Sequence, residues 1–376
     1  MTDLALYFHI PFCRRRCCYC SFASTAGREA DIPNYIQAII NEIGLRRRRQ
    51  TQVKTIYFGG GTPSLLTIPQ VKKILAAVRE NYAVAKNAEI TLEANPGTID
   101  DNYLHLLREG GVNRLSIGMQ SLDDAELKFL ERVHTVAEAI ESIGGARRAG
   151  FTNLSLDFIY GVPGRKNGQW SAMLKNIIDL KAEHLSLYAL SLEEGTALAG
   201  AAERGEVAIP DPDTTAQEYE LACILLEQAG YRQYEISNWA RPGYKSRHNL
   251  TYWTGGDYIG LGWGAHSFLG GARYTGTDDL DGYLETLGAR RLNEQRAEKL
   301  EPAVALGEAM MLGLRLNVGV GMDDIKARFK IDLQEHFRAE IAELAALGLV
   351  EWQEGRLKLT LRGRLLGNEV FIRFLP

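Results

Sequence analysis

Four cysteines lie within eight positions of the segment HIPFCRRRCCYC, residues 9–20, and the rest of the chain holds only one more. Three of them, Cys13, Cys17 and Cys20, form the spacing C-x3-C-x2-C directly after an apolar run that predicts a strand. Three thiolates on one short loop could bind three irons of a [4Fe–4S] cluster and leave the fourth iron without a protein ligand. This loop is the first candidate for chemistry.

Zinc is the main alternative, because His9 or Cys18 could complete the four ligands that a structural zinc site needs. Cys18 also competes with its neighbour Cys17. Successive side chains point in different directions, so we expect only one of the two to face a metal centre. The three arginines at positions 14–16 would favour thiolates and offset an anionic cluster, or they form a solvated loop face.

The overall composition, with 45% hydrophobic residues among 376, is that of a soluble globular protein. This length predicts one large domain and a smaller one. The formal net charge of −4 argues against nucleic acid as a partner, and no apolar run reaches the roughly 18 residues of a membrane span. The cysteine usage does not indicate a disulfide framework, and no secretion signal is evident. We therefore expect a cytoplasmic protein that is not an integral membrane protein.

The elements that must position the cysteine loop follow a repeated pattern of short apolar runs and helical segments. Six runs predict strands at residues 4–10, 53–59, 88–94, 114–120, 153–161 and 184–191. Polar residues stand at or near the ends of the first five, among them Tyr7, Glu93, Gln120 and Asp157. In a barrel-type parallel sheet such ends converge on one mouth, where catalytic groups gather. We predict an α/β fold with a partial, TIM-like (β/α)6 barrel.

Three segments are expected along the chain. Residues 1–230 form the barrel core, and residues 231–295, rich in Gly, Tyr and Trp, form a loop and hairpin extension over its mouth. Residues 296–376 predict a small domain with helices at 322–329 and 332–350, a hairpin at 351–360 and a final helix at 362–375. This unit resembles a winged helix, but its second helix is acidic, so we expect packing or docking in place of nucleic-acid binding.

The cysteine motif, preceded by YFHIPF and containing an aromatic residue at Tyr19, resembles that of the radical S-adenosylmethionine (SAM) superfamily. The resemblance implies that the amino and carboxylate groups of SAM bind the open iron, and that electron transfer cleaves SAM to a 5′-deoxyadenosyl radical. The segment YFGGGTPS at residues 57–64 is similar to the glycine-rich segment that binds the methionine amino group in that superfamily. Glycine there lets the backbone approach a ligand closely.

The order and spacing of further motifs resemble the coproporphyrinogen-oxidase-like branch, the HemN/HemW group, over nearly the whole chain. The motifs are TLEANPG, SIGMQS, FLERVH and LSLDFIYGVPG. The resemblance implies that SAM is contacted by Tyr7, Gly60, Gly61, Thr62, Glu93, Gln120, Arg132 and Asp157. In this interpretation Arg132 pairs with the methionine carboxylate, and Asp157 or Glu93 accepts hydrogen bonds from the ribose.

Three members of the branch compete: the oxygen-independent coproporphyrinogen III dehydrogenases, the HemW haem chaperones, and the radical methylases or cyclopropanases. The dehydrogenase pattern continues with one more cysteine, where this chain has Phe22, and it carries an N-terminal arm where this chain has twelve residues before Cys13. The segment HNLTYW, residues 248–253, resembles the H-N-x-x-Y-W motif associated with haem binding in HemW proteins. The haem chaperone is therefore the favoured interpretation.

The resemblance to HemW implies three ligands: a [4Fe–4S] cluster on Cys13, Cys17 and Cys20, SAM, and haem with His248 as a candidate axial ligand. It also implies partners, namely acceptor proteins such as respiratory-chain haemoproteins, and an electron donor for the cluster. We expect no coproporphyrinogen III dehydrogenase activity.

Overall fold

The computed structural model describes residues 3–166, 168–209, 211–277, 279–292 and 296–376. Its centre is a run of six parallel strands that are neighbours in the order of the sequence. They are β1 (Asp3–Ile10), β4 (Arg48–Gly60), β5 (Tyr82–Ala94), β6 (Arg114–Gln120), β7 (Leu154–Tyr160) and β8 (His184–Ala189). All six predicted strands are confirmed, although β4 and β5 begin five or six residues earlier than the apolar runs indicate.

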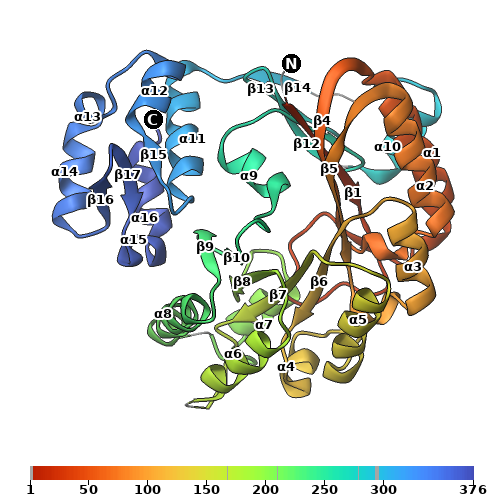
Figure 1. Ribbon diagram of the computed structural model, residues 1–376, viewed down its shortest axis with the longest axis horizontal. Helices are drawn as coiled ribbons and strands as arrows, with labels where there is room; N and C mark the ends of the chain where they lie inside the picture. Colours follow the sequence, from red (N-terminus) through yellow and green to blue (C-terminus); the bar gives the residue numbers. More distant parts are fainter. Residues whose placement is uncertain (1–2, 167, 210, 278, 293–295) are drawn as a thin grey trace.

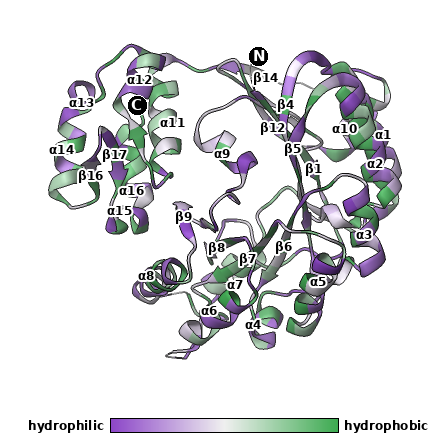
Figure 2. Cartoon of the chain, viewed as in Figure 1, coloured by the Kyte–Doolittle hydropathy of each residue, from purple (hydrophilic) through white to green (hydrophobic). Residues whose placement is uncertain are grey.

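Helices connect these strands and lie on the outside of the curved sheet (Figure 1). They are α1 (Ile32–Leu45), α2 (Ile68–Asn81), α3 (Asp101–Glu109), α4 (Asp124–Phe129), α5 (Val136–Arg148), α6 (Gln169–Asp179), α7 (Ala197–Glu203) and α8 (Pro212–Gln228). Figure 2 shows hydrophobic and hydrophilic residues interspersed along α1, α2 and α3, as expected for helices that pack one face on a sheet. Capping boxes at Thr67 and Thr135 begin α2 and α5.

Short elements complete the turns between strands and helices: β2 (Phe12–Cys13), β3 (Thr25–Ala26), η1 (Glu29–Asp31), η2 (Pro63–Leu65) and η3 (Pro96–Thr98). β2 and β3 pair with each other and bracket the cysteine loop. The loop is thereby held at the carboxyl end of β1.

The extension after the barrel core adds strands to both edges of the sheet. Its elements are β9 (Arg232–Glu235), β10 (Asn238–Ala240), α9 (Arg247–Trp253), β11 (Tyr258–Leu261), β12 (His266–Leu269), β13 (Ala272–Thr275), α10 (Leu280–Gly288) and β14 (Arg296–Lys299). β11 pairs parallel with β1, and β10 pairs antiparallel with β8. The resulting order, β14-β13-β12-β11-β1-β4-β5-β6-β7-β8-β10-β9, is an open sheet, as predicted for an incomplete barrel.

Two parts of this extension, the helices α9 and α10, differ from the expectation of loops and hairpins. The segment HNLTYW forms helix α9, whose first turn is capped by Ser246, with the Ser246 side chain accepting from the backbone N–H of Asn249 at 3.3 Å. At seven residues this helix is too short for its periodicity to stand out in the sequence.

The C-terminal elements surround a second hydrophobic core that runs from Leu306 to Phe374. They are α11 (Pro302–Leu314), β15 (Val320–Gly321), α12 (Met322–Phe329), α13 (Leu333–His336), α14 (Arg338–Ala346), β16 (Val350–Gln353), β17 (Arg356–Leu359), α15 (Leu361–Leu365), α16 (Gly367–Phe371) and η4 (Ile372–Phe374). The hairpin turn at Glu354 and Gly355 has φ of 50° and 72°, as a tight hairpin turn requires. The winged-helix-like prediction is confirmed.

Two of the helices predicted in the C-terminal domain are not continuous, because each is divided into two shorter helices in the structure. The first divides at Phe337, where φ is −110° and ψ is 33°, and the second divides at Leu366 with nearly the same angles. Phe337 packs edge-on against Phe374, with ring centroids 5.1 Å apart. Burial of this ring in the small core outweighs the hydrogen bond lost at the break.

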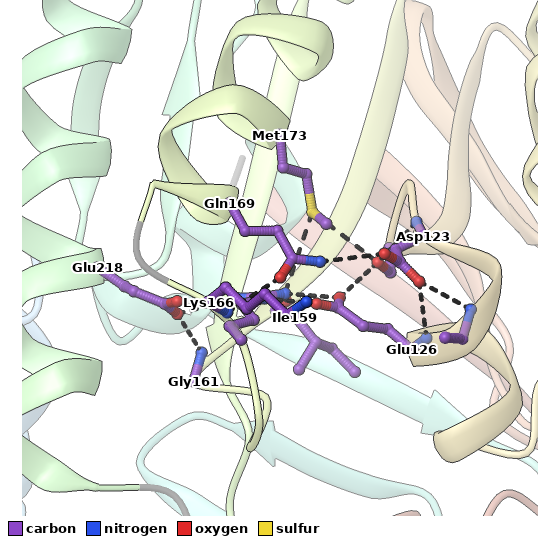
Figure 3. Close-up of polar contacts among 11 residues, drawn as sticks. Asp123, Glu126, Ile159, Gly161, Lys166, Gln169, Met173 and Glu218 are labelled. Atoms are coloured by element: carbon purple, nitrogen blue, oxygen red, sulfur yellow. Dashed lines mark hydrogen bonds and ion pairs between the residues drawn. The ribbon is translucent and has the colours of Figure 1, made fainter.

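A buried ion network ties three barrel elements together on the outer side of the sheet (Figure 3). Arg165, in the loop before α6, binds Glu126 of α4 through two bonds of 2.6 and 2.8 Å. Its Nη1 also donates to Glu218 of α8 at 2.9 Å, and Glu218 accepts from the backbone N–H of Gly161 at 2.6 Å. The three charged side chains are at most 9% exposed.

Within the described residues, no helix has the length and hydropathy needed to cross a bilayer.

Candidate functional site

The inner face of the barrel carries polar residues at alternate positions. On β6 the polar residues are Arg114, Ser116 and Gln120, and with Gly118 they occupy alternate positions on one side of the strand, because successive side chains of a strand alternate. They line a cavity of about 440 Å³ at the carboxyl ends of the strands, the mouth cavity. Other strands and loops contribute Tyr57, Glu93, Asn95, Asp157, His184, Ser186 and Tyr188.

Two carboxylates face this cavity from neighbouring strands. Glu93 accepts from the Tyr57 hydroxyl at 2.7 Å and from the backbone N–H of Gly60 at 3.3 Å. Burial, and after it the nearby charge of Asp157, raises the pKa of Glu93 to about 7 despite the Tyr57 hydrogen bond. Asp157 accepts from Ser116 at 2.9 Å, and burial raises its pKa as well. Both groups are thus acceptors held in place before any ligand enters.

The cysteine loop closes one side of the same cavity. Cys13, Cys17 and Cys20 all line it. The Thr62 hydroxyl donates to Cys13 Sγ at 3.5 Å, and Arg132 Nη1 donates to Cys17 Sγ at 3.4 Å. Among the residues that the structure describes, no three His, Cys, Asp or Glu side chains close on one point that could hold a single metal ion. The three thiols share the mouth cavity as lining groups.

Cys18 points away from this cavity. Its Sγ donates to the carbonyl of Phe129 at 3.5 Å, and its side chain packs on a small apolar cluster that includes Leu130 and Ile159. Burial, and after it the charge of Glu131, raises the pKa of the Cys18 thiol to about 11. Of the two adjacent cysteines, Cys17 is therefore the one that faces the cavity.

The glycine-rich segment allows the chain to pass close to the cysteine loop. A Cβ atom on Gly61 would lie 2.7 Å from the Pro11 carbonyl oxygen and 2.9 Å from Cys13 Sγ. Gly60 has a φ of +116°, in a region that residues with side chains rarely adopt. Any larger residue here would push the first cysteine out of place.

Arg132 lies between the cysteine loop and the strand ends. Besides Cys17, its guanidinium donates to the Asn95 side chain and, at 3.3 Å, to the Gly118 carbonyl. Its Nε is buried and has no hydrogen-bond partner among the described residues. The Nε of Arg114, also at this cavity, is in the same state. Both arginines nevertheless line the cavity, so their guanidinium groups are candidates to meet an anionic group of a ligand.

Gln120 has a left-handed backbone, with φ of 66°, at the end of β6. The register with β7 shifts between Gly118 and Gln120 at the same place. Such conformations cost about 1–3 kcal/mol and persist where the surrounding structure enforces them, often at functional sites.

Of the eight positions predicted to contact SAM, seven line the mouth cavity: Gly60, Gly61, Thr62, Glu93, Gln120, Arg132 and Asp157.

The eighth, Tyr7, lies elsewhere. Its hydroxyl is hydrogen-bonded to His9 Nδ1 at 3.0 Å, and its ring faces a second cavity of about 660 Å³. This interdomain cavity lies between the barrel extension and the C-terminal domain. It is lined by Tyr7, His9, Tyr252, Trp253, Tyr258, Ala265, His266, Phe268, Arg273, Leu300, Ala305, Glu308, Ala309, Met311, Leu312 and Arg328, with small residues of the intervening loops. Ser21, Phe22, Gly60 and Glu93 line both cavities, so the two adjoin.

His248, the predicted axial ligand of haem, lines neither cavity. Its ring is buried, with Nδ1 hydrogen-bonded to Thr55 at 2.8 Å and Nε2 to the Tyr252 hydroxyl at 2.7 Å. It stacks on Tyr57, with ring centroids 4.9 Å apart, and burial, followed by the charge of Arg114, lowers its pKa to about 3. To reach an iron, the neutral imidazole would first have to break one of these two bonds.

Comparisons with known proteins agree on the two-part architecture. A model of the radical SAM superfamily matches residues 7–177, and a model of the HemN C-terminal domain matches residues 300–366. The solved structure of coproporphyrinogen III oxidase (HemN) from Escherichia coli, described as a radical SAM enzyme, superposes with a TM-score of 0.86 at 25% identity, covering 99% of this chain and 90% of that one.

Curated relatives indicate which of the three competing groups this chain resembles. The heme chaperone HemW of Lactococcus lactis is 36% identical over 370 residues, covering 98% of this chain and 96% of the relative. That of Bacillus subtilis is 34% identical over 372 residues, with 98% of each chain covered. The chain belongs to the HemW family. A mitochondrial radical S-adenosyl methionine domain-containing protein 1 from Mus musculus is 35% identical over 388 residues, with 100% of this chain and 88% of the relative covered. HemW membership confirms the resemblance that the cysteine, glycine-rich and HNLTYW motifs indicate.

Some residues of the mouth cavity were missed by sequence reasoning, chiefly Arg114, Asn95 and the inner-face residues His184 and Ser186 of β8. A signal was present. In RLSIGMQ and HLSLYA, polar or small residues alternate with apolar ones, as on the inner face of a barrel strand. Only the strand ends were used in the prediction.

Proposed function

We propose that this HemW-family protein is a haem chaperone that carries a [4Fe–4S] cluster and SAM in the mouth cavity and delivers haem to acceptor proteins. One observation carries the proposal. Three thiols and seven residues of the SAM-type motifs, from six separate parts of the chain, line one cavity, and a larger aromatic cavity adjoins it.

Cys13, Cys17 and Cys20 fit a cluster with one thiolate for each of three irons. All three line the mouth cavity and supply three protein ligands, which suits a cluster with one open iron, whereas a structural zinc site takes four closed ligands. Thr62 and Arg132 already donate to two of these sulfurs. A cluster held here would supply one-electron chemistry next to the open side of the cavity.

SAM fits the remaining groups of the mouth cavity by charge and by hydrogen-bonding capacity. Arg132 lines the cavity without a carboxylate partner among the described residues, so its guanidinium suits the methionine carboxylate. Glu93 and Asp157 are acceptors that suit ribose hydroxyl or amino groups, and the backbone at Gly60 and Gly61 leaves room for close approach. Tyr7 is not part of this set, and we propose that it lines the path between the two cavities.

Haem is the proposed cargo, and its acceptors are haemoproteins that receive it, with a separate electron donor for the cluster. Phe22 supports a chaperone over a dehydrogenase. It is 66% exposed and lies at the border of both cavities, where the dehydrogenase pattern has an additional cysteine. The five free thiols suit a reducing compartment, so we propose the cytoplasm as the location.

The test is a titration of anaerobically reconstituted protein with haem, followed by addition of an apo-haemoprotein. We expect a brown, oxygen-sensitive protein that binds haem and then loses it to the acceptor, together with a SAM-dependent change in the cluster spectrum. A colourless zinc protein, or one that binds no haem, would contradict the proposal.

A further inference from the structure

We infer that haem binds in the interdomain cavity and that His266, not the histidine of the HNLTYW motif, supplies its iron ligand. The inference rests on the proposed function, since it names the site of the proposed cargo. It is carried by the hydrogen-bonding state of the histidines around the two cavities and by the chemistry of the cavity walls.

The interdomain cavity suits a flat, largely apolar molecule. Its volume of about 660 Å³ is within the range of ligand pockets for molecules of this size. One wall is aromatic, formed by Tyr252, Tyr258 and Phe268 of the barrel extension. The facing wall belongs to α11, where Ala305 and Ala309 present small side chains. A porphyrin could lie between an aromatic wall and such a helix face with its apolar surface buried.

Only one histidine at this cavity has a free ring. His9 is bonded through both nitrogens, Nδ1 to the Tyr7 hydroxyl at 3.0 Å and Nε2 to the Ala23 carbonyl at 2.6 Å. His266 lies on β12 at the cavity wall, is exposed, and has no hydrogen-bond partner among the described residues. An imidazole with an unoccupied nitrogen is the commonest axial ligand of haem iron. His266 can act in the observed geometry, whereas His248 cannot.

A free cation is available for the propionate groups. Arg328 of α12 lines the cavity and has no carboxylate partner among the residues described here. Its guanidinium lies over Gly255, where a Cβ atom would be 2.8 Å from Nη1. The other arginine of the cavity, Arg273, is already held by Glu308 through bonds of 2.7 and 2.8 Å. Arg328 is therefore the residue with donors to spare for a carboxylate.

The HNLTYW helix then has a supporting part in the site. His248 is anchored to Thr55 and holds the Tyr252 hydroxyl, and Tyr252 and Trp253 face the cavity. His248 is thus a positioning residue for the aromatic wall.

The experiment compares His266→Ala, His248→Ala and a control, His336→Ala, which removes an exposed histidine of the C-terminal domain. Each full-length, cluster-loaded protein is titrated with ferric haem, and the Soret band is recorded with and without added imidazole. We expect His266→Ala to lose the band of histidine-coordinated haem and to regain it with imidazole. His248→Ala should bind haem more weakly but keep the coordinated spectrum, and His336→Ala should match the wild type.

The outcomes separate the two claims. A wild-type protein without a haem-dependent Soret band refutes the proposed function itself. If the wild type binds haem and His266→Ala keeps its spectrum, or if imidazole rescues His248→Ala and not His266→Ala, the inference is overturned. Iron content per chain checks that each variant retains its cluster and hence its fold.

Arg328→Gln tests the orientation of the cargo. It should weaken haem binding by on the order of tenfold and leave the Soret position unchanged, because a charged hydrogen bond is lost and the iron ligand is not. Haem dimethyl ester, which lacks the propionate charges, should bind the wild type and Arg328→Gln equally. A difference with the ester as large as with haem would remove Arg328 from the site.

Discussion

Two buried arginine sites lie at the ends of the barrel's strands, and they differ in one respect. Arg165 has every donor engaged with Glu126, Glu218 or a backbone carbonyl. Arg132 is equally buried, yet its Nε has no partner among the described residues, and its other donors reach a thiol, an amide and a carbonyl with no carboxylate. The first site is complete without a ligand. The second lines the mouth cavity without a carboxylate partner among the described residues, which makes it the candidate site for an anionic group.

The same contrast separates the two adjacent cysteines. Cys18 packs into an apolar cluster with its thiol bonded to a carbonyl, as a structural cysteine does. Cys17 lines the cavity and accepts from Arg132. In each of these two comparisons, one residue is held by contacts within the barrel and the other lines the mouth cavity. The predictions below test this distinction.

The largest effect is expected from Arg165→Met. Removal of the guanidinium leaves Glu126 and Glu218 as buried carboxylates without a counter-charge, which should lower the free energy of unfolding by about 3–5 kcal/mol. Chemical denaturation measures this. Arg204→Met, which breaks an exposed pair with Glu206, is the control and should leave the free energy of unfolding nearly unchanged. Equal effects in the two variants would mean that the network of Figure 3 is not a structural tie.

Arg132→Met should affect the binding of SAM more than the stability of the fold. No buried carboxylate loses its counter-charge in this variant, so the free energy of unfolding should fall by less than in Arg165→Met, whereas SAM affinity should fall by roughly 1.5–3 kcal/mol of binding free energy. Equilibrium binding of SAM to the cluster-loaded protein measures this, with iron content as a check. Arg148→Met, on the exposed face of α5, should bind SAM like the wild type. An unchanged affinity in Arg132→Met would remove this residue from the SAM site.

The raised pKa of Glu93 predicts a pH dependence of stability. Its folded pKa of about 7 lies above the ordinary value of 4.5, so the folded protein holds the proton more tightly than the unfolded chain. The stabilising contribution is therefore present below pH 4.5 and is lost as the pH rises towards 7 and above. The wild type should lose roughly 2 kcal/mol relative to Glu93→Gln between pH 5 and pH 8.

Denaturation of SAM-free protein at both pH values gives this difference. Glu203→Gln, on an exposed position of α7, should track the wild type at both. A wild type and a Glu93→Gln variant that change in parallel between the two pH values would show that Glu93 titrates as an ordinary glutamate.

The smallest effect is expected from Cys18→Ser. Since the Cys18 side chain faces the apolar cluster, iron content should stay near four per chain, as in a [4Fe–4S] protein. Cys17→Ser is the matched variant and should lose most of the iron. If the two serine variants lost iron alike, the orientation of this pair would be wrong for the cluster-bound state.

The barrel and the cysteine loop were predictable because their signals are local. Each strand of the barrel is a short apolar run, and the spacing of Cys13, Cys17 and Cys20 is contained in eight residues. The side of the loop to which Cys18 turns could not be read in this way, because it depends on the carbonyl of Phe129, more than a hundred residues away.

The sequence does not predict the interdomain cavity, because residues that are far apart in the chain form it through tertiary packing. Tyr7, Tyr252, His266 and Arg328 meet only because β11 pairs with β1 and α11 lies against the extension. In the same way, the burial of His248 follows from its partner Thr55 on β4, which no local pattern reveals. A motif can therefore indicate a ligand correctly while the residue that meets it lies elsewhere in the fold.

The central claim is that this protein binds haem and does not make it. The most direct measurement gives the reduced, cluster-loaded protein SAM with either haem or coproporphyrinogen III and follows both by absorbance and chromatography. We predict a Soret band with haem that passes to an apo-haemoprotein, and no protoporphyrinogen IX from the porphyrinogen. Conversion of coproporphyrinogen III at an enzymatic rate, without haem binding, would contradict the account.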